Sequence, residues 1–172
     1  IETIYGITFM VLAPDGDLVQ ELKPRYKNQD EVKAYIQETV SKSEMDRTEL
    51  NKGKTGCRLE GIKAINPVNG REVEVFIGDF VLANYGTGAV MAVPSHDQRD
   101  FEYAIAHNID RIQVIEGQDV SEHAFEKQDY LGKGCKLINS EEFTGLTVEE
   151  AKVAITKKLV DMGIAKETVN YR

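Results

Sequence analysis

The most informative stretch of this chain for its fold is Tyr85-Gly-Thr-Gly-Ala-Val-Met-Ala-Val-Pro-Ser-His-Asp-Gln-Arg-Asp100. Gly86 and Gly88 permit backbone angles and close approaches that a side chain would forbid. The apolar residues 89–93 then predict a buried strand, and Pro94 ends it. A glycine-rich turn, a strand and a chain break follow one another directly, so we expect them to build one wall of a ligand site.

The same stretch predicts the start of a helix that carries two carboxylates. Ser95 and Gln98 fit a capping box, so the helix should begin there. Asp97 and Asp100 then lie one turn apart, near the positive end of the helix dipole. The residues alone leave two interpretations open: a ligand wall, or a well-capped helix whose first-turn acids face solvent.

The composition indicates one compact domain over residues 1–172, long enough to bury a core. No apolar run approaches the ~20 residues that a membrane helix needs, and no signal peptide is visible. The net charge of −8 argues against a broad surface for nucleic-acid phosphates, which would need clustered basic residues. Two short basic clusters are either local contacts or solvated segments: Lys23, Arg25 and Lys27; and Lys52, Lys54 and Arg58.

The cysteines and histidines suggest neither a disulfide framework nor a metal centre. Cys57 and Cys135 lie far apart and belong to no C-x-x-C pair. The three histidines, His96, His107 and His123, likewise lack the spacing of metal ligands. The sequence therefore predicts no bound metal and a reducing, cytoplasmic location.

The order of the expected elements indicates an α+β fold. Strand patterns, turn signals and helical periodicity alternate without a regular βα repeat. The expected strands are 7–13, 62–65, 73–77, 80–83 and 112–115; the expected helices are 30–43, 97–107 and 148–162. Pro67-Val68-Asn69-Gly70 predicts a hairpin turn, and Thr147 with Glu150 predicts a second capping box before a helix that Gly163 ends. We expect these elements to surround a small β-barrel or a curled sheet.

Three common catalytic or nucleotide-binding motifs are excluded. Gly53-Lys54-Thr55 lacks the earlier glycine of a phosphate loop, and Gly86-Thr87-Gly88 lacks the third glycine of a dinucleotide fingerprint. The chain has no Gly-x-Ser-x-Gly elbow for a nucleophilic serine. Two acids remain as candidates. Asp100 could hold a cation, such as a substrate ammonium, through a charge-assisted hydrogen bond, and Asp97 could do the same or simply complement the helix dipole.

The stretch from Tyr85 to Pro94, followed by His96-Asp-Gln-Arg-Asp-Phe101, closely resembles the editing domain of bacterial-type leucyl-tRNA synthetases, an insertion often called connective peptide one. Three further segments agree in order. Glu2-Thr-Ile-Tyr-Gly6 resembles the end of the family's threonine-rich segment, Thr55 to Gly70 its central hairpin, and Val169-Asn-Tyr-Arg172 the exit into the catalytic body. The sister isoleucyl and valyl enzymes carry a different sequence in place of the central motif.

The resemblance implies a β-barrel core with surrounding helices and a post-transfer editing activity. The implied partner is the 3′ terminal adenosine of leucine tRNA, and the implied reaction is hydrolysis of the ester that joins it to isoleucine, valine, methionine or norvaline. Leucyl-tRNA is to be spared. No cofactor is expected in this domain, because ATP is used by the catalytic body of a longer synthetase. The missing initiator Met also leads us to expect one editing domain cut from such a protein.

The resemblance also assigns roles to individual residues. Asp100 matches the aspartate that binds the substrate α-ammonium, and Thr3 matches the threonine that blocks the branched γ-carbon of leucine. These two are the expected catalytic-site residues. The expected substrate-binding residues are Tyr85, Gly86, Met91, Val93, His96 and Asp97.

Attack by a positioned water, helped by the ribose hydroxyl of the substrate, is the expected chemistry. The family's segment begins with Thr-Thr-Arg, which lies before the present Ile1, and Pro-Asp is common where Ile1-Glu2 stands. The alternative is a non-catalytic module that keeps the fold and only positions the tRNA 3′ end. The acidic net charge weakens that alternative.

Overall fold

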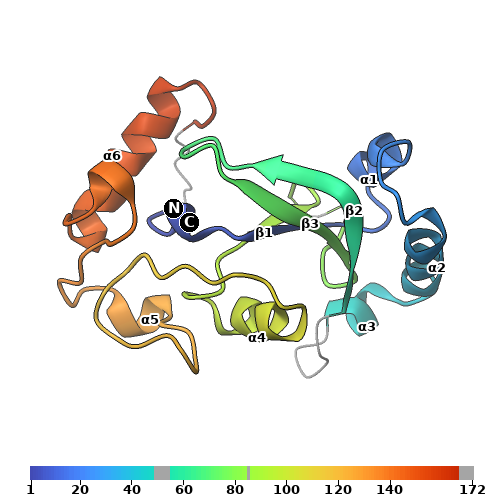
Figure 1. The fold of residues 1–172 in the computed structure, drawn as a ribbon, viewed down its shortest axis with the longest axis horizontal. Helices are drawn as coiled ribbons and strands as arrows, with labels where there is room; N and C mark the ends of the chain where they lie inside the picture. The colour runs from blue at the N-terminus through green and yellow to red at the C-terminus, as the bar shows by residue number, and fades with distance from the viewer. Residues whose placement is uncertain (49–54, 85, 167–172) are drawn as a thin grey trace. The chain divides into compact units, whose positions relative to one another are not determined.

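The computed structural model describes residues 1–48, 55–84 and 86–166 (Figure 1). The backbone forms two compact units. We call Thr8–Ala92 the sheet unit, and Ile1–Ile7 together with Val93–Arg172 the helical unit. In these described ranges no helix combines the length and the apolar composition needed to cross a membrane.

The sheet unit contains four strands, β1 (Phe9–Leu12), β2 (Gly56–Ile65), β3 (Glu72–Gly78) and β4 (Ala89–Ala92), in the order β2-β3-β1-β4. β1 pairs parallel to β3 and antiparallel to β4, and β2 pairs antiparallel to β3. A closed barrel would require the edge strands β2 and β4 to pair, and no such pairing occurs in the described part of the chain. The sheet is therefore open, and the expected small β-barrel core is wrong, whereas the α+β class is confirmed.

The hairpin predicted between β2 and β3 is confirmed. The Asn66 carbonyl accepts the Gly70 N–H (2.8 Å), and Gly70 takes φ 70°, which favours glycine. Farther from the turn the register shifts between Arg58 and Lys63. Such a bulge bends the strand and increases its twist. The local turn residues were sufficient to fix this connection.

Three helices complete the sheet unit: α1 (Asp17–Leu22), α2 (Gln29–Val40) and α3 (Glu44–Thr48). In Figure 1 they lie near one end of the strands. The predicted helical face of residues 30–43 is confirmed, although α2 ends at Val40, which is exposed. The apolar core joins α1 and α2 to the sheet and includes Leu12, Val19, Val32, Leu59 and Ile77. Burying each such side chain contributes about 1.5–3 kcal/mol.

A buried arginine holds the backbone that follows β3. The Arg47 side chain donates to the carbonyls of Asp79 and Val81, each at 2.9 Å. It also contacts the Asp15 carboxylate, with Nη2 and Oδ1 3.2 Å apart. Arginine suits this task because its planar fork carries several donors in fixed directions. The segment expected to form a strand at residues 80–83 is instead a turn.

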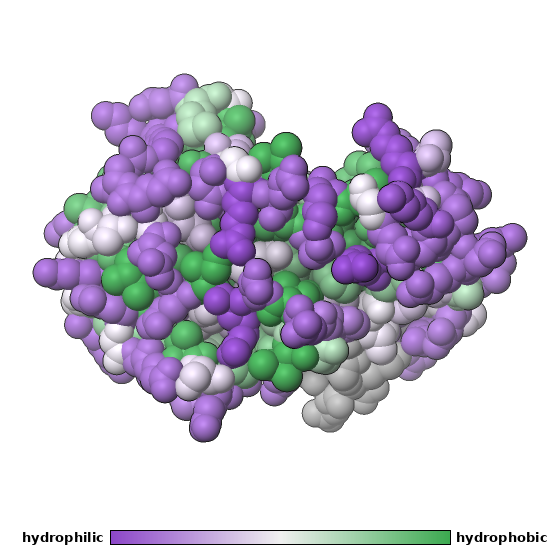
Figure 2. Space-filling view, in the orientation of Figure 1, coloured by the Kyte–Doolittle hydropathy of each residue, from purple (hydrophilic) through white to green (hydrophobic). Residues whose placement is uncertain are grey.

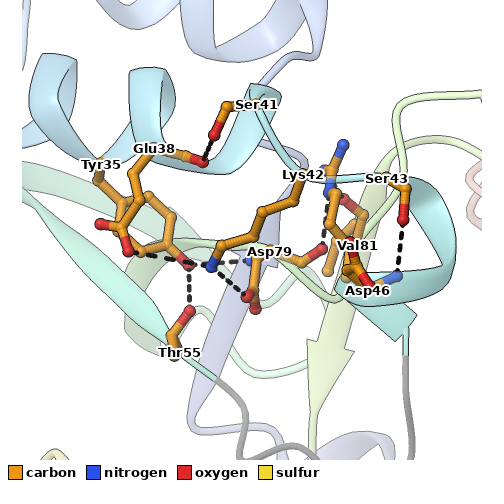
Figure 3. A network of polar contacts seen from close by, with 10 residues as sticks. Tyr35, Glu38, Ser41, Lys42, Ser43, Asp46, Thr55, Asp79 and Val81 are labelled. Atoms are coloured by element: carbon orange, nitrogen blue, oxygen red, sulfur yellow. Dashed lines mark hydrogen bonds and ion pairs between the residues drawn. The ribbon is translucent and has the colours of Figure 1, made fainter.

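The buried side chain of Asp79 is part of the same polar network (Figure 3). Lys42 Nζ lies 3.6 Å from Asp79 Oδ2, and the Asp79 N–H donates to the Tyr35 hydroxyl at 2.9 Å. That hydroxyl is also 2.8 Å from the hydroxyl of Thr55. We call Asp15, Tyr35, Lys42, Arg47 and Asp79 the Arg47 cluster. It ties α2 and α3 to the end of β3.

The helical unit consists of short elements around a separate core: η1 (Ile4–Gly6), α4 (Gln98–Ala106), α5 (Lys127–Tyr130), η2 (Glu141–Phe143) and α6 (Val148–Asp161). Its most buried apolar side chains are Val114, Ile115, Leu137, Val148, Ala151 and Ile155. The strand expected at residues 112–115 is reduced to a single bridge between Ile115 and Leu137. The residues that flank Leu137 form turns, a bend and a second isolated bridge, so no strand ladder extends from it.

The predicted N-cap at Thr147 and the predicted end of α6 at Gly163 are confirmed. Thr147 caps its start by accepting the Glu150 N–H at 3.2 Å. Gly163, with φ 75°, ends it through a Schellman-type turn, in which the Gly163 and Ile164 N–H groups donate to carbonyls of the last turn (2.9 and 3.2 Å). Local sequence thus defines both ends of this helix.

Figure 2 shows a face on which hydrophilic side chains prevail, with smaller hydrophobic areas between them. The exposed apolar residues are dispersed along the chain, as Met45 on α3, Ile65 on β2 and Val153 on α6 illustrate. Scattered residues of this kind are ordinary on protein surfaces and do not mark a docking site.

Candidate functional site

The helix α4 begins two residues later than a Ser95 cap would place it. Asp97 is the N-cap, and its Oδ1 accepts the N–H groups of Arg99 (2.9 Å) and Asp100 (3.0 Å). Ser95 is fully buried in the preceding turn, where its carbonyl accepts the Phe125 N–H. The Ser95 capping box is therefore wrong, because a contact distant in sequence holds that residue outside the helix.

Asp100 lies in the first turn of α4 and is half-buried. Its Oδ2 accepts the backbone N–H of Val93 at 3.2 Å. The helix N-terminus favours a negative charge at this position. The carboxylate is thus fixed against the chain that enters α4.

Thr3 precedes η1 and belongs to the same unit as Asp100. Its backbone has φ −100° and ψ 11°, a sparsely populated region that is common in turns and at active sites. The Thr3 carbonyl accepts the Gly6 N–H at 2.8 Å, and its side chain makes no capping hydrogen bond to η1. The residue is partly exposed.

Gly6 connects the Thr3 segment to the segment that bonds Asp100. A Cβ at Gly6 would lie 3.0 Å from Val93 Cγ1, 3.1 Å from Val114 Cγ2 and 3.2 Å from the Ile112 carbonyl oxygen. A side chain at this position would require these neighbours to shift by a few tenths of an ångström, so the close approach favours glycine. Through Val93, the structure brings together the turn that carries Thr3 and the helix start that carries Asp100.

His96 is a buried structural hub whose ring nitrogens are both bonded to backbone. Nδ1 lies 2.9 Å from the Phe125 carbonyl, which can only accept, so Nδ1 carries the proton. Nε2 then accepts the N–H groups of Val114 (3.0 Å) and Ile115 (3.2 Å). Burial lowers the pKa of His96 below the ordinary 6.5, against smaller raising contributions from the Phe125 carbonyl and Glu2. The neutral ring fixes the entry to α4.

The remaining expected site residues are distributed between the units. Val93 is half-buried in the helical unit, whereas Met91 and Gly86 are exposed in the sheet unit. Tyr85 lies outside the described residues. The strand expected to be buried over 89–93 is the edge strand β4, in which only Ala92 is fully buried, so Met91 is left 57% exposed. That expectation of a buried strand is wrong, because an edge strand has a neighbour on one side.

A buried contact beside Thr3 joins two residues that no local sequence pattern connects. The Tyr130 hydroxyl donates to Glu2 Oε1 at 2.9 Å, and both side chains are buried. The partners are 128 residues apart, so no local pattern signals the pair. The one sequence signal for this pair is that a charged residue, Glu2, immediately precedes the candidate site residue Thr3.

These features define the class of the protein: a mixed α+β domain in which an acidic helix start and a threonine turn meet at one chain segment. A family model described as the leucyl-tRNA synthetase editing domain matches residues 1–160. The chain is 41% identical over 171 residues to a leucine–tRNA ligase of Alkaliphilus oremlandii, covering 99% of this chain and 21% of that protein. A Rhodopirellula baltica leucine–tRNA ligase is 42% identical over 177 residues, covering 99% and 18%.

The chain therefore belongs to the leucyl-tRNA synthetase editing-domain family. It spans about a fifth of the length of these curated relatives. A crystal structure of an Agrobacterium radiobacter LeuRS–tRNA–LeuAMS ternary complex has the same fold, with a TM-score of 0.66 and 24% identity over 94% of this chain and 16% of that one.

Proposed function

We propose that this domain hydrolyses the ester that links isoleucine, valine, methionine or norvaline to the 3′ terminal adenosine of leucine tRNA, after transfer, and spares leucyl-tRNA. A hydrophobic synthetic pocket separates near-isosteric side chains by only ~1–3 kcal/mol, so accurate charging needs a second, hydrolytic selection. The observation that carries the proposal is the fixed Asp100 carboxylate, joined through Val93 and Gly6 to the Thr3 turn.

In this proposal Asp100 binds the α-ammonium of the misattached amino acid. The carboxylate already accepts one backbone N–H, which fixes its orientation before substrate arrives. A charge-assisted hydrogen bond to an ammonium is stronger than a neutral one and defines where the adjacent ester carbonyl lies. Preorganisation of this kind lowers the entropic cost of reaching the reactive geometry.

Thr3 excludes leucine by steric conflict with its branched γ-carbon, which is discrimination by a repulsive contact. The turn closed by the Thr3 carbonyl and the Gly6 N–H holds that backbone in place. The family resemblance further assigns substrate contacts to Met91 and Val93, and to Tyr85 and Gly86. Asp97 shapes the start of α4 by capping it, and His96 holds the preceding residue through hydrogen bonds to the backbone of Phe125, Val114 and Ile115.

The proposed chemistry is attack of an oriented water on the ester carbonyl. The water adds its oxygen to the carbonyl carbon, the bond to the ribose oxygen breaks, and that oxygen takes a proton. The products are the free amino acid and an uncharged tRNA end. A neighbouring ribose hydroxyl of the substrate assists the proton transfers, and the protein contributes orientation.

Substitution of Asp100 tests the ammonium role. Asp100→Asn keeps an oxygen that can accept the Val93 N–H but removes the charge, so clearance of isoleucyl-tRNA(Leu) by the full-length protein should fall about ten- to hundredfold. Asp100→Ala should abolish it. Glu102→Gln removes an exposed carboxylate from the same helix and serves as the matched control. Undiminished clearance by Asp100→Ala would refute the assignment.

Substitution of Thr3 tests the leucine block separately. Thr3→Ala should allow hydrolysis of correctly charged leucyl-tRNA, because it opens space for the γ-branch. Thr3→Val keeps the volume and should continue to spare leucine. If Thr3→Ala also spares leucine, the blocking role is wrong. Wild-type protein that binds the tRNA 3′ end without deacylating it would favour the positioning module instead.

A further inference from the structure

We propose that Tyr130 is a positioning residue for leucine exclusion: through Glu2 it holds the turn that presents Thr3. The inference rests on the proposed editing function and adds to it a specificity determinant remote from Thr3 in sequence. It concerns the helical unit alone, which contains all three residues.

The contact between Tyr130 and Glu2 has a defined direction and is protected from water. The hydroxyl donates and the carboxylate accepts, at 2.9 Å, with 3% and 4% of the two residues exposed. Burial, followed by the charge of Glu2 and this hydrogen bond, raises the pKa of Tyr130 above its ordinary value, so the hydroxyl keeps its proton. A hydrogen bond to a buried charged group is among the stronger polar contacts in proteins.

Tyr130 is itself fixed at the end of α5. Its ring lies edge-on to those of Phe125 and His96, with centroid distances of 5.6 and 6.1 Å. His96 is in turn held by three backbone hydrogen bonds. The donor that reaches Glu2 is therefore anchored to the same chain junction that starts α4 and fixes Asp100.

Glu2 acts on Thr3 through backbone torsions. The Ile4 N–H donates to the Ile1 carbonyl at 3.1 Å, so Glu2 and Thr3 are the central residues of one turn. The third residue of a type I turn has φ near −90° and ψ near 0°, and Thr3 has −100° and 11°. Anchoring the Glu2 side chain thus limits the rotation of the peptide that joins it to Thr3.

The other side of the turn is held by apolar packing. The Tyr5 ring is buried and lies 6.0 Å from that of Phe143, and Gly6 packs against Val93. The backbone on one side of Thr3 is thus held by apolar packing of Tyr5 and Gly6, and on the other side by the hydrogen bond between Glu2 and Tyr130. Because exclusion of leucine depends on a steric contact, a small displacement of Thr3 should impair exclusion more than it impairs clearance of isoleucine.

The test compares two deacylation rates in the full-length protein. Tyr130→Phe removes the donor and keeps the ring; we expect hydrolysis of leucyl-tRNA(Leu) to rise about tenfold while that of isoleucyl-tRNA(Leu) changes by less than about twofold. Tyr26→Phe is the matched control, since it removes the hydroxyl of an equally buried tyrosine in the sheet unit. It should leave the ratio of the two rates unchanged.

Further variants separate positioning from general destabilisation. Glu2→Gln keeps an oxygen that can accept the Tyr130 hydroxyl and should largely preserve the ratio, whereas Glu2→Ala should reproduce Tyr130→Phe. The double variant Glu2→Ala with Tyr130→Phe should add little, because both remove one contact. Amide hydrogen exchange should become faster at Ile4 and Gly6, whose N–H groups close the turn.

Two outcomes overturn the inference in distinguishable ways. If the wild type clears isoleucine and spares leucine, and Tyr130→Phe behaves identically, Tyr130 has no role in exclusion and the editing function stands. If the wild type hydrolyses no mischarged leucine tRNA, the proposed function fails and the exclusion role fails with it.

Discussion

Each unit buries one nitrogen-rich side chain that forms several hydrogen bonds to the backbone. The side chain is a cation in the sheet unit and a neutral ring in the helical unit. Arg47 in the sheet unit donates to two carbonyls and contacts Asp15. His96 in the helical unit donates to one carbonyl and accepts from two N–H groups. Arginine performs its role only as a cation, whereas His96 can accept two N–H groups only as a neutral ring. Both side chains hold irregular backbone in place, but the stability that each provides should respond differently to pH and to substitution.

The largest expected effect is loss of Arg47. Arg47→Met should reduce the free energy of unfolding by about 3–5 kcal/mol, because the Asp79 and Val81 carbonyls lose a buried cationic donor. Urea unfolding measures the change. Arg47→Lys should recover only part of it, since an ammonium cannot reproduce the fork. A loss below about 1 kcal/mol for Arg47→Met would show that the cluster is not a stabilising centre.

Crowding at Gly6 should come next. Gly6→Ala places a methyl within 3.0–3.2 Å of three atoms, and we expect about 1–3 kcal/mol of destabilisation together with slower clearance of isoleucyl-tRNA(Leu). Gly6→Val should be worse on both measures. Equal stability of wild type and Gly6→Val in urea would mean that the segment can move away from Val93 without penalty.

Acid should weaken the helical unit through His96. Its folded-state pKa lies below 6.5 because of burial, so the unfolded chain binds the proton more readily. The contribution of neutral His96 to the free energy of unfolding is therefore fully present above pH 6.5 and is lost as the pH drops below that value. One proton can change the free energy of unfolding by no more than about 1.4 kcal/mol per pH unit. Urea midpoints measured across this range should show the decline in the wild type.

The control for this prediction is a second histidine. His96→Gln should flatten the acid-dependent part of the stability curve, while His123→Gln, at an exposed position, should leave it as in the wild type. If His96→Gln keeps the full acid dependence, another group is responsible, and the contrast with Arg47 loses its basis in charge state.

The smallest effect is expected from the helix caps, which offer a matched pair. Asp97→Ala and Thr147→Ala each remove an N-cap acceptor and should each cost about 1 kcal/mol in urea unfolding. Asp97→Ala should additionally slow clearance of isoleucyl-tRNA(Leu), because it loosens the turn that bears Asp100. Thr147→Ala should leave clearance unchanged. Equal rates of clearance by both variants would show that the N-cap of α4 does not contribute to the editing site.

Features governed by neighbouring residues were predicted well. The hairpin at residues 67–70 and both ends of α6 follow from turn and cap chemistry within a few positions. The cap of α4 was misassigned by two residues, since Phe125 holds the Ser95 carbonyl outside the helix. The barrel was wrong because closure depends on which strands meet at the sheet edges, and local pattern does not encode that pairing.

The sequence by itself determined the α+β class, the main helices and, through the motif between Tyr85 and Asp100, the family. It determined these because propensity, periodicity and a specific motif are properties of contiguous residues. Tertiary structure alone decided that the sheet is open, that His96 is neutral, and that Tyr130 bonds Glu2 across 128 positions. Those outcomes depend on burial and on partners that are distant in sequence and meet only in the folded chain. The local sequence pattern therefore does not predict them.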